Sequence, residues 1–128
     1  MPGFLVTMMG AGLSAGQANA INGYGTAGQT ATGATQGTAF PLTTEFTEFT
    51  TVAASTGALL PAPTGVRPPG TGDAFLVANQ GANALLVYPP VGFQIGLAGA
   101  NTGVSVASGK VGYFVAKGNG NFWGGSLA

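Results

Sequence analysis

The chain has 128 residues, of which only six are charged, and it contains neither histidine nor cysteine. Soluble domains usually have about a quarter of their residues charged. The composition therefore excludes disulfides and zinc or transition-metal sites built on histidine or cysteine. Three basic residues are also too few to bind nucleic acid through its phosphates, and we expect no cofactor.

The scarcity of charge points to association with other proteins. Three basic and three acidic residues cancel, so the formal net charge is zero. A folded monomer of this size exposes about 6,000 Å², so an interface-sized patch of about 800 Å² holds on average less than one charge. Because a free protein of this kind would be poorly soluble, we expect much of its surface to be covered in the working state.

The first part of the chain differs in composition from the rest. Residues 1–25 are rich in glycine and alanine and are predicted to form an extended arm, followed by a single domain over residues 26–128. The apolar run near the start is interrupted by glycines and is far shorter than the about 20 residues of a membrane span, so no membrane partner is expected. Its apolar side chains are the candidate interface residues: Phe4, Leu5, Val6, Met8, Met9 and Leu13.

Short apolar runs separated by turn residues follow from residue 36 to residue 123, at spacings of about 8–12 residues. This pattern predicts an all-β fold, a small antiparallel β-sandwich or barrel that is jelly-roll-like, with almost no helix. The expected strands are 36–42, 45–52, 58–60, 73–79, 84–88, 93–97, 103–107, 110–116 and 121–123.

Two pairs of these runs carry the signature of a β-hairpin. A four-residue loop with one glycine, Gln80–Asn83, separates 73–79 from 84–88. The two residues Ser108 and Gly109 separate 103–107 from 110–116. Short loops with glycine favour direct pairing of the flanking strands, so both pairs are predicted to be hairpins.

Few residues suggest catalysis. Ser108 and Lys110 bring a hydroxyl near an amine, but they lie at a predicted turn, where serine and glycine are expected anyway. Glu45 and Glu48 are the only closely spaced carboxylates, and an offset of three places them on opposite faces of a strand. Gly10 and Gly12 lack the lysine and hydroxyl residue of a phosphate-binding loop. The sequence therefore predicts no enzyme site.

Three aromatic residues are candidates for a carbohydrate-binding platform. The chain has a single tryptophan, Trp123, and the tyrosines Tyr88 and Tyr113 lie in predicted strands. Because aromatic rings bury the most surface per residue, packing in a core or an interface is the favoured interpretation of all three.

Several segments resemble small virion proteins that tailed bacteriophages encode beside capsid and tail genes. They are TGATQGTAFPL at 32–42, TTVAASTGALLPAP at 50–63, VANQGANALLVYPPVG at 77–92, NTGVSVASGKVGYFVA at 101–116 and the closing Trp123. The resemblance spans Thr26 to Trp123 and contains no catalytic motif.

The resemblance implies a structural component of a virion, of the capsid decoration or cement type. Such proteins are commonly β-barrels or jelly rolls, often homotrimers, and they bind the major capsid protein at junctions between capsomers. The expected location is the capsid surface. Two alternatives stay open: a fibre, spike or receptor-binding module, and a structural subunit of the tail or connector.

Overall fold

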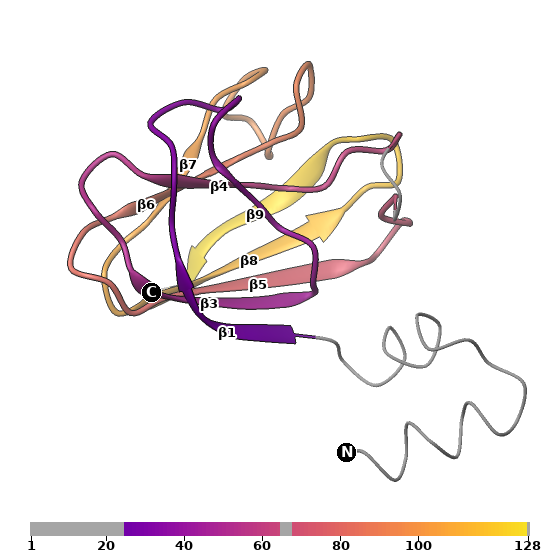
Figure 1. The fold of residues 1–128 in the computed structure, drawn as a ribbon. Coiled ribbons are helices and arrows are strands. Elements are labelled where there is room, and N and C mark those ends of the chain that lie inside the picture. The colour runs from indigo at the N-terminus through magenta and orange to yellow at the C-terminus, as the bar shows by residue number, and fades with distance from the viewer. Residues whose placement is uncertain (1–24, 65–67, 128) are drawn as a thin grey trace, which may run out of the picture.

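The computed structural model describes residues 25–64 and 68–127, which form nine β-strands in two sheets (Figure 1). Sheet A has the order β1-β3-β5-β8-β9, and sheet B has the order β2-β4-β6-β7. The strands are β1 (Gly25–Thr30), β2 (Phe40–Pro41), β3 (Phe46–Thr51), β4 (Gly57–Leu59), β5 (Ala74–Asn79), β6 (Leu85–Tyr88), β7 (Val104–Val106), β8 (Lys110–Ala116) and β9 (Phe122–Leu127).

The first six strands alternate between the two sheets along the chain. As a result β1, β3 and β5 are neighbours in sheet A, and β2, β4 and β6 are neighbours in sheet B. All four of these neighbouring pairs are parallel. Parallel strands need a crossover connection, and here a strand of the opposite sheet serves as the crossover in place of a helix.

The last three strands complete the sheets by antiparallel pairing. β7 pairs with β6 in sheet B, while β8 lies between β5 and β9 in sheet A. Both sheets are therefore mixed. The expectation of an antiparallel arrangement is wrong for four of the seven strand pairs. The described strands close no barrel, because no strand of sheet A pairs with a strand of sheet B.

Both predicted hairpins are wrong, because their strands lie in different sheets. β5 belongs to sheet A and β6 to sheet B, and likewise β7 belongs to sheet B and β8 to sheet A. Both members of each pair carry buried apolar side chains, such as Val77 and Val87, or Val106 and Phe114. Placing the members in facing sheets lets these side chains bury one another, which a single-layer hairpin does not allow.

Asn79 fixes the corner between β5 and β6. Its buried side chain donates hydrogen bonds to the carbonyl oxygens of Asn83 (2.8 Å) and Val106 (2.9 Å), and its Oδ1 accepts one from the Gly81 amide (3.0 Å). Gly81 packs so closely on Val52 that a Cβ there would lie 2.5 Å from the valine Cβ. These contacts are specific to a corner that passes from one sheet to the other.

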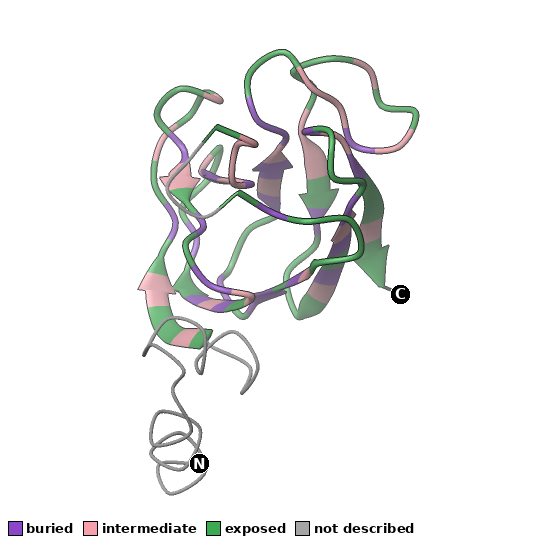
Figure 2. Ribbon diagram, turned by 90° about the vertical axis from the view of Figure 1, so that its right-hand side faces the viewer, coloured by how far each residue is buried: buried purple, intermediate pink, exposed green. Residues whose placement is uncertain are grey.

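One hydrophobic core lies between the sheets. Sheet A contributes Phe49, Val77 and Phe114, and sheet B contributes Leu85 and Val87, all fully buried. Buried and exposed residues alternate along the strands (Figure 2). Two edge-to-face ring pairs add contacts, Phe40 with Phe49 and Phe75 with Phe122.

The all-β expectation is confirmed, since the described residues contain no helix. Eight of the nine expected runs coincide with strands, but 93–97 forms only an isolated bridge between Ile95 and Phe122. Strand β1 was missed because its sequence, GTAGQT, has no large apolar residue. The jelly-roll expectation is not confirmed, and the predicted arm, except for Gly25, lies outside the described residues.

Candidate assembly surface

The outer face of sheet A carries most of the large apolar side chains that the described residues expose. Seven such side chains are exposed. Two of them, Val91 and Leu97, lie in the loop after β6. The other five point outward from sheet A: Phe46, Leu76, Tyr113, Trp123 and Leu127.

Strand register arranges these side chains in rows across the sheet. The central row runs from Gly25 through Phe46, Leu76 and Tyr113 to Gly125, crossing all five strands. On one side of it lies a row of Ala74, Val115 and Trp123, and on the other a row of Glu48, Ala78, Val111 and Leu127. We call the apolar residues of these rows the assembly face: Phe46, Ala74, Leu76, Ala78, Val111, Tyr113, Val115, Trp123 and Leu127.

The alternation of strand side chains explains why this face exists. On β5 the residues Phe75, Val77 and Asn79 point into the core, so Leu76 must point outward. On β8 the core residue Phe114 lies between Tyr113 and Val115 in the same way. A sheet with one face in water normally has polar residues on that face, and here the outward positions within β5 and β8 are apolar.

Charge is confined to two opposite margins of the assembly face. Of the charged residues that the structure describes, only Glu48 and Lys117 are at outward positions of sheet A. Glu48 accepts hydrogen bonds from the Gly28 amide (3.2 Å) and from Gln80 Nε2 (2.9 Å). Lys117 Nζ lies 5.3 Å from the centre of the Trp123 ring. The area between these two margins is uncharged.

The area of the assembly face is about half of one side of a standard protein interface. The four strands that carry it, about 4.8 Å apart and each about six residues long at about 3.3 Å per residue, cover about 380 Å². Contiguous exposed apolar patches of more than a few hundred Å² mark interaction sites on soluble proteins. The assembly face is therefore the candidate functional surface.

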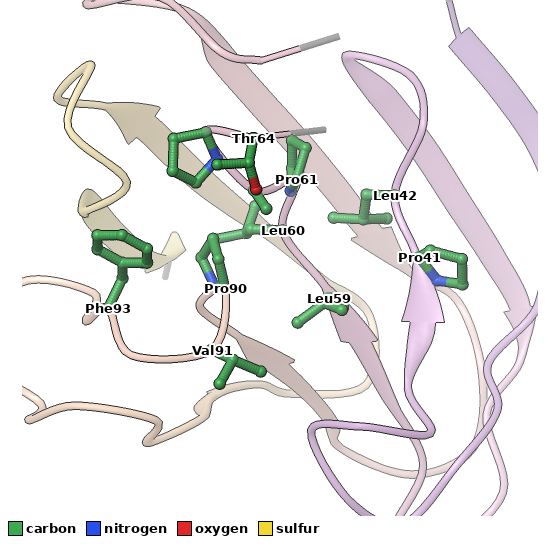
Figure 3. A pocket seen from close by; sticks show the side chains of 11 residues that line it. Pro41, Leu42, Leu59, Leu60, Pro61, Thr64, Pro90, Val91 and Phe93 are labelled. Atoms are coloured by element: carbon green, nitrogen blue, oxygen red, sulfur yellow. The ribbon is translucent and has the colours of Figure 1, made fainter. Parts of the chain in front are cut away.

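A second apolar feature is a recess of about 410 Å³ beside sheet B (Figure 3). Leucines and prolines from the ends of β2, β4 and β6 form its walls, and the only side-chain hydroxyl that lines it belongs to Thr64. Small-molecule sites usually have several convergent polar groups that orient a ligand. The recess has the apolar lining of such a site without this polar set.

Two of the candidate catalytic side chains, Ser108 and Glu48, make structural contacts. The Ser108 hydroxyl donates to the Gly81 carbonyl oxygen at the corner between β7 and β8, and Lys110 is exposed. Glu48 holds β1 and the Gln80 loop through the hydrogen bonds given above. No group of three or more His, Cys, Asp or Glu side chains gathers anywhere in the described part of the chain.

Of the three aromatic residues expected to pack in a core or an interface, only Tyr88 is partly buried within the described residues. Trp123 and Tyr113 lie half-exposed on the assembly face, where an interface would cover them, and Tyr88 is partly buried on β6 beside Gly57 and Gly103. The predicted interface residues, from Phe4 to Leu13, lie outside the described residues. In the described segments, no helix is long and apolar enough to cross a membrane.

Sequence reasoning missed the assembly face, although a signal for it was present. In 74–78 and 111–116 apolar residues or glycine occupy both sets of alternating positions. A strand that is apolar on both faces is typical of burial on both faces. Only one partner layer, sheet B, exists within the described residues, so they leave the other face of sheet A uncovered.

No protein-family model, no curated protein and no solved structure matches the chain. Its function is therefore inferred from its composition, from the geometry of the assembly face and from the resemblance described above.

Proposed function

We propose that this chain is a non-enzymatic structural protein of a virion, which decorates and stabilises a bacteriophage capsid by burying apolar surface at capsomer junctions. The observation that carries the proposal is the assembly face. Five of its nine residues are large apolar side chains that are exposed on one sheet, with no charge between them. The resemblance of residues 26–123 to small virion proteins supports the capsid as the setting.

The energetics favour a role in association. At about 25 cal/mol per Å², covering about 380 Å² contributes at most about 10 kcal/mol before the costs of association, because not all of that area is apolar. Those costs are several kcal/mol or more, so the affinity of a single contact of this kind is moderate. On a capsid lattice many such contacts act together, and their combined avidity exceeds that of one.

The two-sheet, sandwich-like arrangement supports this role. A five-stranded sheet on a shared core holds the outward side chains in fixed positions, so little entropy is lost when a partner covers them. The major capsid protein is the proposed partner, and the proposed location is the capsid surface.

The recess beside sheet B favours one alternative, a fibre, spike or receptor-binding module. A module of that kind needs a site to hold a ligand, and the recess is a hollow on the described surface. The recess lacks the polar lining groups that orient a ligand. It therefore supports this alternative less than the assembly face supports capsid decoration. The two roles also differ in copy number, because a fibre occupies few sites and a decoration protein covers the shell.

Particles depleted of this protein test the proposal. We expect purified wild-type chain to bind such particles in many copies across the shell and to raise the temperature at which they release DNA. Tyr113→Lys, which places a charge in the middle of the assembly face, should abolish both effects, whereas Ala107→Lys, at an exposed corner, should not. Binding at a single vertex, or unchanged heat release, would contradict decoration.

A further inference from the structure

We propose that Asn119 is a site of spontaneous deamidation, at which its carboxamide is converted into an aspartate or an isoaspartate. This inference concerns the loop between β8 and β9, residues 117–121, and does not depend on the proposed function. Asn119 is exposed in this loop and is followed directly by Gly120. Asparagine is among the thermally labile residues of proteins, and a following glycine has no Cβ to obstruct attack on the carboxamide by its own amide nitrogen.

The fold itself requires the glycine of this pair. Gly120 has a φ of +98°, a conformation that residues with a side chain rarely adopt. It is buried against the Phe93 ring, with which a Cβ at this position would collide. The next residue carries a Cβ, which hinders the attack, at each of the other asparagines that the structure describes: Asn79, Asn83, Asn101 and Asn121.

The Asn119 side chain is held in a position that favours the reaction. The Asn121 amide donates a hydrogen bond to Asn119 Oδ1 (3.1 Å). This bond folds the carboxamide over the chain that follows it, so that Cγ and the Gly120 nitrogen belong to one hydrogen-bonded ring. Attack on Cγ develops negative charge on Oδ1, and an amide donor already placed at that oxygen stabilises the charge. Within the described part of the chain, the Gly120 amide donates to no backbone acceptor, so no such bond has to break before it attacks.

The reaction needs only water as a second reactant. The Gly120 nitrogen forms a bond to Asn119 Cγ, the bond between Cγ and Nδ2 breaks, and Nδ2 leaves as ammonia with the proton of the Gly120 amide. The product is a succinimide ring. Water then opens this ring and returns a proton to the Gly120 nitrogen. Hydrolysis at Cγ gives aspartate, and hydrolysis at the main-chain carbonyl carbon gives isoaspartate.

Either product changes the loop that leads into β9. Deamidation adds a negative charge to a chain whose formal net charge is zero. The new carboxylate is two residues from Lys117, whose Nζ lies 5.3 Å from the centre of the Trp123 ring at the margin of the assembly face. Isoaspartate also lengthens the main chain inside the loop, which a hydrogen bond from the Lys117 amide to the Asn121 carbonyl oxygen (2.9 Å) closes. Deamidation therefore alters both the charge and the closure of this margin.

Incubation of the purified full chain at mildly alkaline pH, followed by tandem mass spectrometry of its peptides, tests the proposal. Asn22, which also precedes a glycine in the sequence, serves as an internal clock, and the same chain unfolded in urea is the reference. In the folded chain we expect Asn119 to be converted at least about tenfold faster than any other described asparagine, because only its carboxamide combines a bound donor with an unobstructed neighbouring amide. Both aspartate and isoaspartate should form at position 119.

Asn119→Gln is the matched control, because it keeps a carboxamide but must close a larger ring. Position 119 of this variant should stay unmodified while Asn22 is converted at the wild-type rate. An Asn119 that stays intact in the folded chain while the chain in urea is converted would overturn the proposal, since the fold would then protect the site. Equal conversion of Asn119 and Asn101 in the folded chain would also overturn it.

Discussion

At the scale of single residues, Gly124 shows how closely β9 packs on β8. Its φ is +150°, and a Cβ at this position would lie 1.9 Å from the carbonyl oxygen of Tyr113. Its neighbour Gly125 has no positive φ, and a Cβ there would meet no atom within 4 Å. The two adjacent glycines are thus a natural pair of test position and control.

We expect Gly124→Ala to lower the free energy of unfolding by about 3 kcal/mol, because it combines backbone strain with a collision against the neighbouring strand. Gly125→Ala should change it by less than about 1 kcal/mol. Urea denaturation of both variants measures the difference. Equal effects would mean that β9 does not pair with β8 in the register described.

At the scale of the element, β3 shows what sequence reasoning could and could not resolve. The run 45–52 was predicted as a strand, which is confirmed, but the spacing of Phe46 and Phe49 did not fit simple alternation. In the structure Phe49 is in the core against Phe40, with ring centres 5.2 Å apart, and Phe46 is on the assembly face. The same residue type therefore has two roles on one strand.

Substitution of these two phenylalanines separates the roles. Phe49→Ala should lower the free energy of unfolding by about 3–5 kcal/mol, because it leaves a cavity in a closely packed core. Phe46→Ala should cost about 1 kcal/mol or less, because its ring is already partly in water. Thermal unfolding at low protein concentration measures both, and a reversed order would show that β3 presents the opposite face to the core.

Most strand positions could be predicted from the sequence, but their pairing could not. Runs of Thr, Val, Phe and Leu indicate strands through local preference. Which strand lies beside which depends on contacts between distant residues, such as the Asn79 side chain with the Val106 carbonyl. The loop 80–83 looked like a hairpin turn because a glycine in a short loop suits both a hairpin and a corner between sheets.

The assembly face was missed for a related reason. Its residues come from β3, β5, β8 and β9, which are far apart in the sequence, and only the sheet order brings them together. The low charge of the chain led us to expect uncharged surface patches, but composition alone does not show where on the molecule they lie. The interface role that the sequence predicts for the apolar residues from Phe4 to Leu13 stays a prediction.

Across the whole molecule, composition, sheet order and association are linked. Mixed pairing places five strands in one open sheet, and its outer face carries apolar residues where charged ones are usual. The central claim is that this face is covered in the working assembly. Trp123 is the only tryptophan of the chain and is 50% exposed on that face, so its fluorescence reports on the face without any label.

Acrylamide quenching of Trp123 fluorescence tests this claim most directly. The quenching is measured for the dilute chain and for the chain assembled on particles, and the tryptophan signal of particles without this protein is subtracted from the latter. The account predicts that assembly lowers the quenching constant several-fold and shifts the emission to shorter wavelength, as burial of the indole requires. Quenching that is equally strong in the dilute and the assembled protein would contradict it.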